Sequence, residues 1–273
     1  MQSVPDYFYE VTMTSPATSK AGVTESEKDW PPAIEIVNEH GSSDVVLLCE
    51  HASAHVPEEY NRLGLSETEL HRHIGWDIGA AAVTRHLAEL LDAPAFLGTY
   101  SRLLIDLNRP PEVSENGANV PASIPLRSER TDIPGNVGIG ADEIARRRAR
   151  IFDPYHAFVA SHLDQRPTTG TRLVTIHSFT PLYMDEKRPW HCGVLFNKSW
   201  RFAERILCVL GAEEGLVLGA NVPYTISEDA DYAIPVHGEG RGLDSVLIEI
   251  RQDLISDDQT ARQWAERLAK ALR

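Results

Sequence analysis

Two histidines, His51 and His177, each come directly after a short apolar run that is typical of a buried β-strand. In open α/β sheets, ligands bind at the carboxyl ends of the strands, so we expect both imidazoles to face one crevice. Imidazole binds metals and exchanges protons near neutral pH. The alternative is that each histidine only caps its strand by hydrogen bonding to a neighbouring carbonyl.

Glu249 lies within the apolar segment 247–250. Strand alternation places its carboxylate on one face and its apolar neighbours on the other. A carboxylate in such a strand needs a partner. It is either held in a structural ion pair with Arg251 or another arginine, or it acts as a general base whose pKa is set by burial and a nearby cation.

Arg102, Asn108 and Arg109 lie in the segment 101–109, which is followed by two prolines. The planar guanidinium of Arg109 can bind a carboxylate with two hydrogen bonds, and the Asn108 amide can add another. This pattern predicts an amino-acid-like substrate. Alternatively, Arg109 pairs with Asp106 or with another of the many acidic side chains.

The composition excludes several classes of function. The 273 residues include 26 Lys and Arg against 40 Asp and Glu, which gives a net charge of −14. Nucleic acids and anionic membranes need a positive surface, so neither is expected as a partner, and a small molecule is. The longest apolar runs are far shorter than the ~20 residues of a membrane span. The N-terminus lacks the pattern of a secretory signal, so we expect a cytoplasmic protein.

The order of elements predicts an α/β domain over residues 41–273, preceded by a flexible or loosely docked arm over residues 1–40. The arm is rich in Ser, Thr, Pro and acidic residues and has no apolar periodicity. Expected strands are 45–49, 100–107, 173–176, 193–196 and 245–250. Expected helices lie within 66–91, 144–162 (divided at Pro154), 199–210 (capped by Ser199) and 264–272, and a long loop is expected at 110–140.

Five ordered blocks of the sequence resemble the N-formylglutamate amidohydrolase family. They are CEHAS at 49–53, HIGWDIGA at 73–80, YSRLLIDLNR at 100–109, IHSF at 176–179 and IEIRQDL at 248–254. The resemblance extends over about residues 44–270. It implies a single domain with a mixed β-sheet flanked by helices, similar to the zinc-dependent exopeptidases and the phosphorylase/hydrolase-like fold.

The resemblance also implies one zinc ion at the strand ends, held by His51, Asp77 and His177, with Glu249 as the general base. The first ligand segment departs from the zinc carboxypeptidase pattern, because position 54 is alanine instead of glutamate. Asp77 is the expected replacement, and Glu50 and His55 are the alternatives. Zinc would lower the pKa of water towards ~7 and make hydroxide available.

The implied reaction is hydrolysis of an N-formyl or other short N-acyl group from an acidic or related amino acid. The implied substrate-binding residues are Arg102, Asn108, Arg109, Ser178, Tyr224 and His237. One alternative is an amidase or carboxypeptidase-like enzyme with a different substrate. Another is a non-catalytic protein that binds acyl-amino acids, which the missing glutamate at position 54 would favour. A homo-oligomer is possible.

Overall fold

The computed structural model describes residues 30–112 and 120–273. Residues 1–29 of the predicted arm therefore lie outside the described residues. The predicted arm boundary at residue 40 needs correction, because β1 (Ile34–Val37) already belongs to the main sheet, where it pairs antiparallel with β3 (Ala95–Gly98). Its short length and partly exposed side chains left too weak an apolar pattern to predict from the sequence.

In the described part of the chain, seven strands form one mixed sheet in the order β1-β3-β2-β6-β11-β9-β10. Neighbours among β3, β2, β6 and β11 pair in parallel, as do β9 and β10, whereas β9 is antiparallel to β11. The other five strands of this sheet are β2 (Val45–Cys49), β6 (Arg172–Phe179), β9 (Cys192–Leu195), β10 (Leu218–Ala220) and β11 (Asp244–Arg251). The prediction of an α/β domain with a mixed sheet is confirmed.

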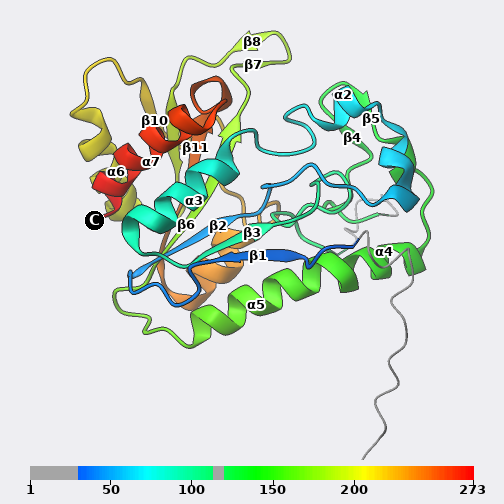
Figure 1. Ribbon diagram of the computed structural model, residues 1–273, viewed down its shortest axis with the longest axis horizontal. Helices are drawn as coiled ribbons and strands as arrows, with labels where there is room; N and C mark the ends of the chain where they lie inside the picture. Colours follow the sequence, from blue (N-terminus) through cyan, green and yellow to red (C-terminus); the bar gives the residue numbers. More distant parts are fainter. Residues whose placement is uncertain (1–29, 113–119) are drawn as a thin grey trace, which may run out of the picture.

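Helices cover both faces of the sheet (Figure 1). Helices α3 (Ala80–Leu91), α6 (Trp200–Gly211) and α7 (Asp258–Leu272) pack together over one face, and α5 (Asp153–Asp164) lies on the other. The shorter helices are α2 (Glu67–Leu70), α4 (Ala141–Arg147), η1 (Glu58–Gly64), η2 (Pro134–Asn136), η3 (Arg148–Phe152), η4 (Ala233–Gly238), η5 (Glu239–Arg241) and η6 (Gln252–Leu254). None of the described helices is long and apolar enough to cross a membrane.

Side-chain alternation along β6 and β11 separates the core from the polar residues. Ile176, Ile248 and Ile250 belong to the core beneath α3, α6 and α7. The residues between them point to the opposite face, since successive side chains of a strand alternate. The parallel register places Glu249 directly opposite His177. Pairing of the two strands therefore brings together two residues that are distant in the sequence.

The segment 100–107 is not a strand, contrary to the prediction. The backbone forms turns, in which Leu104 N–H donates to Ser101 O and Asp106 N–H donates to Ser123 O. Its apolar side chains, Leu103, Leu104, Ile105 and Leu107, are all buried. A turn enclosed on every side by the core shows the same continuous apolar run as a buried strand, so the sequence pattern could not separate the two.

Three local predictions concern the ends of helices. The capping box of Ser66 and Glu69 is present at α2. Pro154 is the second residue of α5, directly after the π-helical turn η3, so the helical stretch changes from π to α at the proline where a division was predicted. Ser199 precedes α6 but does not cap it, because its hydroxyl accepts a hydrogen bond from Ser245 N–H instead.

Two short hairpins extend from the domain. One is formed by β4 (Arg127–Ser128) and β5 (Thr131–Asp132), within the predicted loop 110–140, of which 113–119 lie outside the described residues. The other is formed by β7 (Leu182–Tyr183) and β8 (Glu186–Lys187), shortly after the end of β6 (Figure 1).

Gly79 fixes the start of α3 two residues after Asp77, and we expect Gly79→Ala to destabilise the protein strongly. Its φ is +83°, and a Cβ would lie 2.1 Å from Ile255 O. Gly138 also has positive φ, +72°, but open space around it, so Gly138→Ala is the matched control. We expect a loss of about 1–2 kcal/mol for Gly138→Ala from backbone strain and ~1–3 kcal/mol more for Gly79→Ala from the clash, both measured by urea unfolding. Equal losses would contradict the close approach of Ile255.

Candidate functional site

A cavity of about 550 Å³ opens at the ends of β2, β6 and β11. The predicted site residues that line it are His51, Asp77, Arg102, Asn108, Arg109, His177, Ser178, Tyr224 and Glu249. The structure thus brings nine of the ten predicted residues to one cavity and leaves out His237. The sequence predicts that His177 comes directly after a strand. In the structure it lies within β6, because this strand continues to Phe179.

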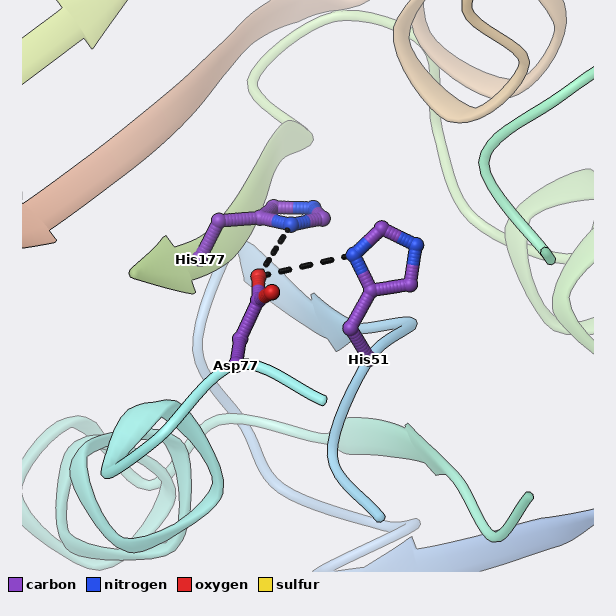
Figure 2. Close-up of side chains that lie close together, drawn as sticks. All are labelled: His51, Asp77 and His177. Carbon is purple, nitrogen blue, oxygen red and sulfur yellow. Dashed lines mark hydrogen bonds and ion pairs between the residues drawn. The ribbon is translucent and has the colours of Figure 1, made fainter. Parts of the chain in front are cut away.

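His51, Asp77 and His177 converge from three different elements (Figure 2). His51 follows β2, Asp77 precedes α3, and His177 lies in β6. One carboxylate oxygen, Asp77 Oδ2, lies 2.8 Å from His177 Nδ1 and 3.4 Å from His51 Nδ1. All three residues are buried, and His51 Nδ1 has no hydrogen-bond partner among the described residues.

The outer ring nitrogens of the two histidines face other carboxylates. His51 Nε2 lies 2.7 Å from Asp106 Oδ1, and His177 Nε2 lies 3.0 Å from Glu50 Oε2. Carboxylates in this position orient histidine rings in many metal sites and increase their basicity. Both rings are therefore fixed with Nδ1 directed towards Asp77.

The electrostatics of this cluster favour a positive charge at its centre. Burial by itself would lower the pKa of His177, but Asp77 and Glu50 raise it well above its ordinary value. Burial by itself would raise the pKa of Asp77, but His51 and His177 lower it below the ordinary value. Two imidazoles and a carboxylate are a donor set that suits zinc, so these residues fit a metal ion.

The two alternative ligands occupy different positions. Glu50 contacts the outer nitrogen of His177 and does not line the cavity. His55 lies in a separate groove beside Ala54 and Trp76. Asp77 thus supplies the carboxylate nearest to both Nδ1 atoms.

Glu249 lies beside this cluster, on the neighbouring strand. Its side chain is buried, and Oε2 has no hydrogen-bond partner in the described part of the chain. Burial raises the pKa of Glu249 to about 8, although His177 and Arg102 partly oppose this shift. The structural alternative, an ion pair with Arg251, does not form, because Arg251 pairs with Asp253.

The two arginines of the segment 101–109 contact acidic residues. Arg102 lies 2.9 Å from Asp106 Oδ2 and 3.3 Å from Asp77 Oδ1. Arg109 pairs with Asp231 at 2.6 Å, not with Asp106. Both side chains are partly exposed to the cavity and have further N–H groups to offer.

Asn108 and Ser178 have roles within the walls of the site. The Asn108 side-chain oxygen accepts hydrogen bonds from Tyr232 N–H and Ala233 N–H, which anchors the start of η4. Ser178 N–H lies 3.3 Å from Asp77 Oδ2, and its hydroxyl donates to Ile78 O. Ser178 therefore helps to hold Asp77 and its neighbours in place.

The structure places His237 away from the cavity, so its prediction as a substrate-binding residue is not supported by its position. Its Nε2 lies 2.8 Å from His156 Nδ1, and His156 Nε2 lies 2.9 Å from Leu107 O. Burial lowers the pKa of His237 to about 4. A glycine- and proline-rich segment is typical of an exposed loop, but here the segment forms the π-helix η4, which packs against α5.

Sequence reasoning did not find several residues that support the site. Glu50 and Asp106 were noted only as a possible ligand and a possible partner of Arg109, and each proves to hold a histidine ring. Their nearness to His51 and Asn108 in the sequence was the available signal. Asp231 and Arg188 lie in loop segments without any pattern that could have indicated their partners.

Comparisons with known proteins identify a family and similar folds. The family model described as N-formylglutamate amidohydrolase matches residues 43–256. A gene product of Agrobacterium tumefaciens of known structure is 35% identical, with a TM-score of 0.82 over 90% of this chain and 95% of that chain. The N-formylglutamate amidohydrolase of Ralstonia eutropha is 16% identical and shares the fold, with a TM-score of 0.59 over 89% of this chain and 96% of that chain. None of the curated proteins matches the chain.

The raised pKa of Glu249 predicts a pH-dependent effect of Glu249→Gln on stability. The unfolded chain releases this proton near the ordinary pKa of 4.5, whereas the folded chain holds it until about pH 8. The folded state binds more protons between these values, so its stability falls as pH rises through this window. In metal-free protein, we expect the stability gained by Glu249→Gln to grow between pH 5 and pH 8, by a few kcal/mol.

Urea unfolding at both pH values measures this effect. Glu266→Gln, at a half-exposed carboxylate, is the control for removing one negative charge. A stability difference between Glu249→Gln and wild type that stays constant from pH 5 to pH 8 would show that Glu249 is not a buried acid with a raised pKa.

Proposed function

The chain belongs to the N-formylglutamate amidohydrolase family, and we propose that it is a zinc-dependent enzyme that hydrolyses the amide bond of N-formyl-L-glutamate or a similar N-acyl amino acid. The products are formate, or the corresponding acid, and the free amino acid. The observation that supports this most is the meeting of His51 Nδ1, His177 Nδ1 and Asp77 Oδ2 beside the buried carboxylate of Glu249.

His51, Asp77 and His177 are the residues that would hold the metal. Zinc in a site with three protein ligands supplies Lewis acidity, which activates water and polarises an amide carbonyl. Asp77 replaces the glutamate that position 54 lacks, so the absence of that glutamate does not by itself favour a non-catalytic binding protein.

Glu249 is the general base in this proposal. Its carboxylate takes a proton from the attacking water and then gives it to the amide nitrogen, so that the amine can leave. Burial raises the pKa of this carboxyl above its ordinary value, which makes the carboxylate a stronger base than an exposed glutamate. Oε2, which has no partner in the described part of the chain, is available to the water.

Arg102 and Arg109 provide positive charge on the substrate side of the cavity. Arg102 lies next to Asp77, so its remaining N–H groups can stabilise the negative charge that develops on the acyl oxygen. Arg109, which also lines the cavity, can bind the α-carboxylate of the substrate. Tyr224 lines the same cavity and can donate a further hydrogen bond.

Metal content tests the ligand assignment directly. We expect about one zinc per wild-type chain and a loss of both metal and N-formylglutamate hydrolysis in His177→Ala, because a site with three ligands depends on each of them. His86→Ala is the matched control, since His86 pairs with Asp258 on the surface helices. Elemental analysis and an assay of released formate on the same samples provide the measurement. Wild-type protein that hydrolyses the substrate without bound metal would refute the proposal.

Glu249→Gln tests the role of the base. The amide fills nearly the same space but cannot accept a proton, so we expect kcat to fall by about 10²–10⁴-fold while KM changes little. Steady-state kinetics with N-formylglutamate measure both constants, and metal analysis shows that the zinc site is intact. An unchanged kcat in metal-loaded Glu249→Gln would assign the proton transfer to another group.

A further inference from the structure

Arg188 follows the β7–β8 hairpin and lies between two tyrosines of the cavity wall. Its guanidinium carbon is 4.4 Å from the ring centre of Tyr183 and 4.7 Å from that of Tyr224. Its Nη1 donates a hydrogen bond to Tyr224 Oη at 2.8 Å. Both tyrosines line the cavity and are partly exposed. Arg188 does not line the cavity itself, but it lies directly behind these two side chains.

The charge balance of the cavity sets Arg188 apart from the other arginines. Arg102 pairs with Asp77 and Asp106, and Arg109 pairs with Asp231. Glu129, which also lines the cavity, is paired with Arg72 and His73. Arg188 takes part in none of the ion pairs formed within residues 30–112 and 120–273. Its positive charge therefore has no carboxylate partner in this part of the chain.

The contacts of Arg188 also leave most of its N–H groups without an acceptor in the described part of the chain. Aromatic rings contact the flat faces of a guanidinium, whereas carboxylates bind to its N–H edges. One Nη1 hydrogen of Arg188 is bonded to Tyr224, and Nη2 and Nε have no acceptor among the described residues. The tyrosines thus fix the plane of the group and limit the entropy that it would lose on binding a ligand.

We propose that Arg188 binds the side-chain carboxylate of an acidic N-acyl amino acid and so determines the preference for acidic over neutral substrates. The inference rests on the proposed function. It assigns the α-carboxylate to Arg109, which pairs with Asp231, and the second carboxylate to Arg188, which has no ion pair among the described residues. Arg188 is near enough to the reacting centre for its charge to lower the pKa of Glu249.

The test compares N-formyl-L-glutamate with N-formyl-L-glutamine, which has nearly the same size and no side-chain charge. For Arg188→Gln we expect kcat/KM for the acidic substrate to fall roughly ten- to a hundredfold, mainly through KM, because a charged hydrogen-bond pair is lost. We expect little change for the neutral substrate. Arg188→Lys, which keeps the charge but loses the planar fork, should recover part of the preference.

Arg201→Gln is the matched control. Arg201 also lies over an aromatic ring, that of Trp200, at 5.3 Å, but it belongs to α6, and Trp200, unlike Tyr183 and Tyr224, does not line the cavity. Equal losses on both substrates in Arg188→Gln would overturn the proposal and assign Arg188 a structural role or the α-carboxylate. Unchanged kinetics on both substrates would overturn it as well.

A binding measurement separates this inference from the proposed function. If wild-type enzyme hydrolyses neither formyl-amino acid, the proposed function fails, and calorimetric titration with L-glutamate and L-glutamine still tests Arg188. Tighter binding of L-glutamate by wild type, with the difference abolished in Arg188→Gln, supports the inference. Equal binding of the two amino acids by wild type, or no binding of either, overturns it.

Discussion

The candidate site depends on the cost of burying carboxylates. Asp77, Asp106 and Glu50 are all nearly inaccessible to solvent at the ends of β2 and the segments that follow. Buried charges are stable only when they are paired, so each carboxylate requires a positive or hydrogen-donating neighbour. His51 and His177 meet this requirement, because each ring has one nitrogen next to Asp77 and the other next to a second carboxylate. The same contacts that neutralise the carboxylates therefore fix both imidazoles in one orientation, with Nδ1 of each ring directed to Asp77.

Strand register connects this cluster to Glu249. Because β6 and β11 pair in parallel and in register, His177 and Glu249 lie side by side, while Ile176, Ile248 and Ile250 are buried in the core of the other face. A shift of one residue in either strand would direct one of the two polar side chains into the apolar core, which is energetically prohibitive. The apolar core thus enforces the geometry of the polar site. The low-dielectric surroundings that raise the pKa of Glu249 come from the same packing.

The sequence predicts those parts of the structure that depend on local patterns. The strand 45–49, the capping box at Ser66 and the alternation around Glu249 follow from short-range physical rules and are present. The segment 100–107 is wrongly predicted, because continuous burial of a turn gives the same apolar run as a buried strand. The surroundings of His237 and Arg188 could not be predicted from the sequence either. Whether such residues face a cavity, a helix or a pair of tyrosines is decided by tertiary packing between segments far apart in sequence, which leaves no local pattern.

The strongly negative net charge of the chain appears unfavourable for an acidic substrate, but local pairing matters more than the total. Exposed charges are screened over about 8 Å at physiological ionic strength, so most of the acidic surface acts only weakly on a molecule inside the cavity. Within the cavity, Asp231 and Glu129 are already paired with cations, which removes much of their repulsion. The groups left to act on a ligand are the free N–H edges of the arginines and the His–Asp–His cluster with its preference for a cation. An acidic protein can therefore present a site that attracts anions, because the field at short range is set by the few charges that remain unpaired there.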